Sequence, residues 1–243
     1  MGLLEHFIYP DWPAPANVKA LQTTRHGGIS AAPFDTLNLG SHVGDVPRAV
    51  AHNRQLLAPL MPSEPVWLEQ VHGTVVASAD AADCRVQADA CIARHRGAVC
   101  VVMTADCLPL LLCDEAGTVV GAVHAGWKGL AAGVIEATVK AMDVAPHKLM
   151  AWLGPAISQQ SFEVGGEVRA VFMAHDVRAA EAFIPHGEKF HADIYQLAHL
   201  RLHALGITRI FGGNLCTFHQ RDKFFSYRRD GVTGRMGTFI WLA

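Results

Sequence analysis

The sequence contains no run of about 18 consecutive apolar residues, which is the length that a membrane-spanning helix needs. The chain also has no large excess of positive or negative charge, because the net charge of its 243 residues is −2 at pH 7. A strongly electrostatic partner such as nucleic acid or an anionic membrane surface is therefore not expected. The N-terminal "MGLLEHFIYPDWPAP" lacks the basic start and apolar core of a secretory signal. We therefore expect a cytoplasmic protein without a nucleic-acid or membrane partner.

Cysteine is sparse, and its spacing is uninformative. The six cysteines form no Cys-x-x-Cys pair, and without a signal peptide we expect no disulfide framework. The sequence also has no His-x-His motif, although it contains fourteen histidines. This high histidine count keeps metal binding and acid–base chemistry open. The cysteines are Cys84, Cys91, Cys100, Cys107, Cys113 and Cys216.

Repeats, low-complexity tracts and an obvious linker are absent, so we expect one domain over residues 1–243. Apolar stretches typical of strands are interleaved with helical patterns, which predicts an α/β or α+β fold with mixed sheets. Asp45 and Asp193 are predicted to cap helices. Strands are predicted at 18–24, 66–72, 74–79, 97–104, 108–114, 118–124, 148–154, 207–212 and 237–242. Helices are predicted at 46–60, 130–142, within 163–175 and at 194–206.

Three reactive side chains lie at the ends of predicted strands. Cys107 interrupts the apolar run "VVMTADCLPLLLC", His124 precedes the glycine-rich "AGWKGL", and His72 precedes Gly73. Strand ends beside glycine-rich turns are where α/β proteins place reactive groups. Together, one cysteine and two histidines would form a metal site or a nucleophile pair. Their spacings of 35 and 17 residues match no local zinc motif, so inert packing also stays open.

Eight motifs give the chain a resemblance to a known family from about residue 18 to the C-terminus. They are "TTRHGGIS", "NLGSHVGD", "EQVHG", "TADCLPLLL", "HAGWKG", "GPAI", "FEVGGEV" and "FFSYRRDGVTGRM", in this order. The chain resembles the YfiH family, also called the laccase-domain, purine nucleoside phosphorylase or peptidoglycan editing factor family. The resemblance implies a single-domain, four-layer α/β/β/α sandwich with mixed sheets. It also implies a relation to necrotizing-factor toxins, which are cysteine hydrolases.

The resemblance further implies that His72, Cys107 and His124 bind a zinc ion and carry the catalysis. Two histidines and a thiolate leave one tetrahedral position open, as in catalytic zinc sites, where bound water is acidified. The implied substrates are purine nucleosides, through phosphorolysis of adenosine, inosine and methylthioadenosine or deamination of adenosine. A second implied activity is an amidase that removes L-Ser from UDP-MurNAc-L-Ser in peptidoglycan precursor editing. Whether Cys107 is only a ligand or also a nucleophile stays open.

Two other functions compete with a zinc enzyme. The laccase name suggests a copper-dependent polyphenol oxidase. The absence of His-x-His and of a compact Cys–His–Met loop after Cys107 makes copper a poorer fit than zinc. A non-catalytic zinc-binding protein would need a fourth ligand to close the site, and no obvious one lies near the three in sequence.

Further side chains are candidates for substrate binding or for support of the cluster. Asp106 is a candidate for orienting a ligand or for holding the turn. Asp89, in "ADACI", is a candidate for supporting the metal ligands or for acting as a general base, with a turn residue as the alternative. Asn38 is a candidate for positioning the substrate. "SQQSF" follows "GPAI" where relatives often carry Gly-Pro and a tyrosine, so the 159–162 loop is expected to shape substrate contacts differently. Four arginines could hold a phosphate or carboxylate, or be surface charge: Arg25, Arg228, Arg229 and Arg235.

Overall fold

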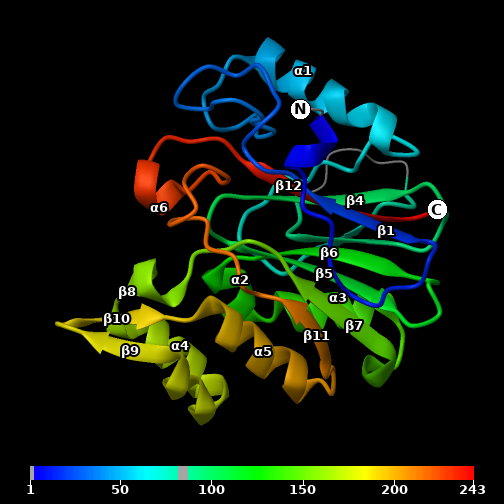
Figure 1. The fold of residues 1–243 in the computed structure, drawn as a ribbon. Helices are drawn as coiled ribbons and strands as arrows, with labels where there is room; N and C mark the ends of the chain where they lie inside the picture. Colours follow the sequence, from blue (N-terminus) through cyan, green and yellow to red (C-terminus); the bar gives the residue numbers. More distant parts are fainter. Residues whose placement is uncertain (1–2, 82–86) are drawn as a thin grey trace.

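Two β-sheets face one another in the computed structural model, which describes residues 3–81 and 87–243 (Figure 1). The first sheet is antiparallel with the order β1-β12-β4, and the second is mixed with the order β11-β7-β5-β6-β3-β2. The first contains β1 (Val18–Gln22), β4 (Val99–Thr104) and β12 (Met236–Leu242). The second contains β2 (Val76–Ser78), β3 (Ala90–Ala93), β5 (Leu108–Asp114), β6 (Val120–Ala125), β7 (Leu149–Leu153) and β11 (Arg209–Gly212).

Helices cover the outer face of each sheet. Helix α1 (Pro47–Leu57) packs through Leu57 on the three-stranded sheet, and α3 (Val134–Met142) and α5 (Ile194–Ala204) pack on the six-stranded sheet. A separate apolar cluster fills the space between the two sheets. Figure 1 shows the resulting order of helix, sheet, sheet and helix. The predicted four-layer α/β/β/α architecture with mixed sheets is therefore confirmed.

A small third sheet lies to one side, next to α4 (Figure 1). It is antiparallel with the order β8-β10-β9. Its strands are β8 (Glu163–Val164), β9 (Phe183–His186) and β10 (Lys189–Ala192). The other α-helices are α2 (Trp127–Ala132), α4 (Gly166–His175) and α6 (Tyr227–Asp230). Short 3₁₀ helices occur at Leu3–His6, Ala58–Leu60, Pro146–Lys148, Gln159–Ser161 and Val177–Ala182. No described helix is both long and apolar enough to cross a bilayer.

Burial on both faces explains the long apolar run that contains Cys107. In β5, Leu110 and Leu112 point toward the helices, whereas Leu111 and Cys113 point toward the other sheet. Successive side chains of a strand alternate between its two faces. Because both faces of β5 are buried, the strand is apolar throughout instead of alternating with polar residues.

The polar break at Asp106 is the place where the chain changes sheets. Strand β4 ends in the first sheet at Thr104, and β5 begins in the second sheet at Leu108. Asp106 has a φ of 95°, which is uncommon for a residue with a side chain. Its carboxylate accepts hydrogen bonds from Thr217 Oγ1 and from the backbone amide of Arg228, both at 2.6 Å. These bonds offset the cost of burying the carboxylate and tie the crossing to α6.

Residues 66–72 do not form the predicted strand. Val66 and Glu69 make only isolated bridges, to Cys100 and Gln87. The side chain of Gln70 instead bonds both backbone groups of Met103, at 2.8 and 2.7 Å. Hydrogen bonds from the Gln70 side chain therefore attach this segment to β4, where a strand would use backbone hydrogen bonds.

The helix predictions need two further corrections. Asp45 does not cap α1: the N-cap is Val46, and the Asp45 carboxylate accepts hydrogen bonds from Ser30 and Asn38. The helix predicted over 130–142 is two helices, because Gly133 has a φ of 99° and ends α2 before α3 starts. Asp193 does cap α5, accepting a hydrogen bond from the backbone amide of Gln196.

Candidate metal centre

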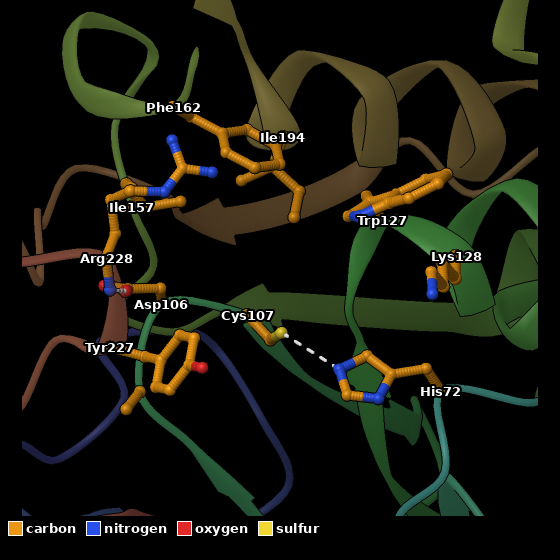
Figure 2. A pocket seen from close by; sticks show the side chains of 11 residues that line it. His72, Asp106, Cys107, Trp127, Lys128, Ile157, Phe162, Ile194, Tyr227 and Arg228 are labelled. Atoms are coloured by element: carbon orange, nitrogen blue, oxygen red, sulfur yellow. Dashed lines mark hydrogen bonds between the residues drawn. The ribbon is translucent and has the colours of Figure 1, made fainter. Parts of the chain in front are cut away.

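Three separate parts of the chain bring His72, Cys107 and His124 together. Their potential ligand atoms all lie within 4.8 Å of one another. The Sγ of Cys107 is 3.7 Å from Nε2 of His72, and the ring centroids of the two histidines are 4.8 Å apart. Figure 2 shows Cys107 and His72 facing one another at the edge of a cavity. His124 is buried behind them at the end of β6.

Asp89 holds both histidines in place. This carboxylate is completely buried. It accepts hydrogen bonds from three successive backbone amides, those of Val71, His72 and Gly73, at 3.2, 2.8 and 2.6 Å. Its Oδ1 also lies 2.8 Å from Nδ1 of His124. That contact leaves Nε2 of His124 as the nitrogen available to a metal, which is the usual arrangement behind a histidine ligand.

Close backbone approach explains the glycines of "HAGWKG". A Cβ at Gly126 would lie 2.7 Å from Cδ2 of His72 and 3.0 Å from Sγ of Cys107. A Cβ at Gly129 would lie 2.9 Å from the carbonyl oxygen of Gly73. The start of α2 therefore fits against the cluster only without side chains at these two positions. His72 itself has a φ of 62°, a left-handed conformation held by its contacts to the buried carboxylate.

The cluster favours a thiolate beside a protonated imidazole when no metal is bound. Burial alone would raise the pKa of Cys107, but the charge and hydrogen bonds of His124 and His72 outweigh it and lower this pKa to about 6. Burial would lower the pKa of His124, but Cys107 and Asp89 raise it to about 9. For Asp89, hydrogen bonds from His124 and the Gly73 amide outweigh burial and hold the pKa below its ordinary value. The positive charge on His124 therefore stabilises the negative charges on Cys107 and Asp89, and they stabilise it in turn.

The donor set fits a zinc ion. Zinc takes thiolate and imidazole ligands at about 2.0–2.3 Å. Donor atoms within 4.8 Å of one another can reach that geometry with small side-chain adjustments. Among the described residues, no fourth His, Cys, Asp or Glu joins this group. The arrangement therefore leaves a coordination position for water or substrate on the side of the cavity.

The cavity next to the cluster combines aromatic walls with positive charge (Figure 2). Its volume is about 280 Å³, at the small end for small-molecule sites. Trp127, Phe162 and Tyr227 supply the aromatic surface, and Lys128 and Arg228 supply the cations. The described lining residues are His72, Ala105, Asp106, Cys107, Trp127, Lys128, Ile157, Phe162, Ile194, Tyr227 and Arg228. Phe162 ends the loop that departs from the family pattern.

Of the candidate arginines, Arg228 lines the cavity and Arg235 lies near the cluster. The guanidinium of Arg228 donates to the carbonyl oxygens of Ser161 and Glu163 and lies 5.5 Å from the Phe162 ring centroid. Burial lowers the pKa of Arg235, while negative charge on Cys107 raises it, so the two groups are within electrostatic reach. Nη1 of Arg235 donates to the carbonyl oxygens of Thr233 and Gly234. No ion pair to a carboxylate is found for either arginine among the described residues, so both stay candidates for anion binding.

The other two arginines and Asn38 are occupied by local structure. Arg25 pairs with the carboxylate of Asp35 at 3.1 Å and faces a different hollow. Arg229 pairs with the carboxylate of Asp230 at 2.7 Å, and its guanidinium also donates to three backbone carbonyls. Asn38 is fully buried, and its side chain bonds Gly40, Asp45 and the amide of Arg235. We therefore do not retain these three as substrate ligands.

The sequence reasoning also missed several cavity residues. Trp127 and Lys128 lie in the same motif as the predicted ligand His124, and Tyr227 directly precedes the predicted anion-binding residue Arg228. Their position next to predicted site residues could have indicated that they line the site. His42, in "NLGSHVGD", is close enough to His124 to feel its charge. Its pKa is lowered by burial first and then by the charges of Arg235, Arg54 and His124.

Comparison with known proteins places the chain in a family. A family model described as "Multi-copper polyphenol oxidoreductase laccase" matches residues 19–243. "Purine nucleoside phosphorylase YfiH" of Escherichia coli (strain K12) is 54% identical, with 98% of this chain and 100% of that protein covered. The chain belongs to the YfiH family. "Purine nucleoside phosphorylase PA4543" of Pseudomonas aeruginosa is 52% identical, with 97% of this chain and 98% of that protein covered.

Solved structures of YfiH-family proteins share the fold. Protein NMB0706 of Neisseria meningitidis superposes with a TM-score of 0.94 at 51% identity, covering 98% of this chain and 99% of that one. YlmD of Geobacillus stearothermophilus gives a TM-score of 0.87 at 30% identity, covering 95% and 93%. The relation to necrotizing-factor toxins stays a prediction.

We predict that Cys107 of the metal-free protein reacts with iodoacetamide with a midpoint near pH 6. Its pKa is lowered to about 6, so the reactive thiolate forms as the pH rises through that value. Peptide mass spectrometry after short exposures between pH 4 and pH 10 measures the profile. Cys113 is the internal control, because burial raises the pKa of its thiol to about 12. A Cys107 midpoint near the ordinary value of about 8.5 would contradict the described electrostatics.

We also predict that Asp89→Asn weakens zinc binding by about 10–100-fold, the usual effect of removing a carboxylate behind a histidine ligand. The amide has one acceptor oxygen where the carboxylate uses two, so His72 and His124 lose part of their orientation. Competition with a chromophoric chelator measures the affinity. Asp143→Asn, at an exposed αL position, is the matched control. An unchanged affinity in a folded Asp89→Asn protein would contradict the role of Asp89.

Proposed function

We propose that this protein is a zinc-dependent enzyme that acts on purine nucleosides, with phosphorolysis as its main reaction. One observation carries the proposal: three potential metal ligands border a cavity that has both aromatic walls and cations. His72, Cys107 and His124 would hold the zinc. Relatives that are 54% and 52% identical are named purine nucleoside phosphorylases, which supports the same substrate class.

Zinc suits this site better than copper, although the family model carries a laccase description. A blue-copper centre adds a weak axial methionine to two histidines and a cysteine. No methionine is among the described residues that line the cavity. The sequence also lacks His-x-His. These observations support a metal that works without changing its oxidation state.

The cations favour phosphorolysis over deamination. Phosphorolysis joins a phosphate oxygen to C1′ of the ribose while the bond from C1′ to N9 of the purine breaks. The site must therefore hold an anion and a flat base together. Arg228 and Lys128 lie on opposite sides of the cavity in Figure 2 and can share the phosphate charge. Deamination replaces the 6-amino group by oxygen from water and needs no anion.

The chain's own residues position the reactants. Trp127, Phe162 and Tyr227 offer faces on which a purine can stack. Carbonyl oxygens of Ser161 and Glu163 hold the guanidinium of Arg228 in a fixed place at the wall. When bound, zinc would supply a Lewis acid next to these groups. Asp89 keeps His124 oriented with Nε2 toward the metal position.

Removal of L-Ser from UDP-MurNAc-L-Ser is the other substrate class that the sequence resemblance implies. The cavity of about 280 Å³ fits a nucleoside better than the whole UDP-linked precursor. The precursor therefore serves as the comparison substrate, and so does adenosine without phosphate.

The test is turnover of these substrates by the zinc-loaded protein. We expect adenine release from adenosine that depends on phosphate and is faster than inosine formation or L-Ser release. Cys107→Ala should lose zinc and turnover together. Arg228→Ala and Lys128→Ala should each raise the KM for phosphate by about tenfold or more, because each removes a charged hydrogen-bond donor. Lys140→Ala, on the exposed face of α3, is the control.

Two outcomes would contradict the proposed function. One is a metal-free protein that turns over at the full rate, which would favour a Cys107 nucleophile with His124 as its base. The other is faster release of L-Ser from the precursor than of adenine from adenosine, which would make precursor editing the main activity.

A further inference from the structure

A second group of metal-binding side chains lies on the small sheet β8-β10-β9, away from the Cys107 cluster. Glu163, His186 and His191 each offer a ligand atom, and these atoms all lie within 4.8 Å of one another. The three residues come from three different strands. Their side chains take no part in the proposed nucleoside chemistry, although the backbone carbonyl of Glu163 contacts the cavity residue Arg228.

Strand register explains why the three side chains meet. His191 lies directly opposite Glu163 of β8 on one side and Ile184 of β9 on the other. His186 is two residues beyond Ile184, so it points to the same face. Directly opposite and diagonal neighbours on one face of an antiparallel sheet lie within reach of long side chains. The pairing therefore places one carboxylate and two imidazoles on one face.

Contacts among these groups hold the three side chains close together. Nδ1 of His186 is 3.2 Å from Oε2 of Glu163. The His186 and His191 rings stack with centroids 4.2 Å apart and an interplanar angle of 21°. Lys189 donates to the other carboxylate oxygen, Oε1, at 2.6 Å, which leaves Oε2 for another partner.

We propose that Glu163, His186 and His191 form an outer site for a divalent transition-metal ion such as Zn²⁺. Imidazole and carboxylate are ligands that such ions accept, and three protein ligands leave further positions to water. The ion would replace the hydrogen bond between His186 and Glu163, while Lys189 keeps its oxygen. His186 is 58% exposed and Glu163 36%, so both have room to adjust by the ångström or so that coordination requires.

The outer site is connected to the cavity wall. Glu163 directly follows Phe162, which lines the cavity. The carbonyl oxygen of Glu163 accepts a hydrogen bond at 2.9 Å from the guanidinium of Arg228. A metal ion there would join β8, β9 and β10 beside these two cavity residues. Binding at the outer site does not depend on the proposed nucleoside activity.

Titration with Zn²⁺ alone, by calorimetry, tests the proposal on full-length protein that already carries one equivalent of zinc. We expect a second, weaker equivalent. Its affinity should fall by at least about tenfold in Glu163→Gln and in His186→Ala, since even partners behind a ligand contribute that much. His147→Ala, which removes an exposed histidine outside both clusters, should leave both equivalents unchanged. Glu163 and His186 are at least partly exposed, so we expect both variants to fold, and circular dichroism checks this.

Cobalt substitution identifies where the second ion binds. Co²⁺ at Cys107 gives a thiolate charge-transfer band, whereas Co²⁺ at Glu163, His186 and His191 has no sulfur ligand. We expect the second equivalent of Co²⁺ to add visible d–d absorption without a further sulfur band. The proposal is overturned if no second equivalent binds, if Glu163→Gln and His186→Ala both bind it as tightly as the unsubstituted protein does, or if it adds a sulfur band.

Discussion

The candidate centre depends on one buried carboxylate. Leaving Asp89 unpaired in the interior would cost several kcal/mol, so its position is tolerated only with a full set of donors. Three consecutive amides around His72 and the imidazole of His124 supply that set. The backbone adds a further link, because the amide of His124 donates to the carbonyl oxygen of Asp89 at 2.7 Å. Asp89 thereby fixes a left-handed turn and a strand end relative to each other, and Cys107 completes the group from the crossing between the two sheets.

The sequence predicts β4, β5, β6, β7 and β12, because these strands are buried on both faces and are therefore largely apolar. It predicts no strand for the short β3, although β3 is equally buried, or for the small sheet β8-β10-β9. The prediction fails at 66–72, where a strand-like apolar pattern has no ladder. There Gln70 bonds both backbone groups of Met103 with its side chain, an interaction that propensity and periodicity do not register. The helix at 130–142 is divided because Gly133 adopts a positive φ and ends α2, whereas the apolar periodicity continues through it.

Site prediction from the sequence divides in a similar way. Cys107 and His124 could be selected because the ends of their strands are visible in the sequence. The selection of His72 rests on the end of a strand at 66–72 that does not form, so only the family resemblance links it to the other two. The sequence does not show which arginine remains free to bind a ligand. The charge of Arg229 is taken up by its neighbour Asp230, and that of Arg25 by Asp35, and only the folded geometry shows these pairings. The aromatic wall of the cavity was missed because Trp127 comes from α2, Phe162 from a loop and Tyr227 from α6.

The central claim is that His72, Cys107 and His124 together hold one zinc ion. X-ray absorption at the zinc edge, on protein loaded with a single equivalent, tests it most directly. The account predicts a first shell with one sulfur at about 2.3 Å and two imidazole nitrogens at about 2.0–2.1 Å, completed by one lighter donor. A first shell without sulfur, or one with two or more sulfurs, would contradict it.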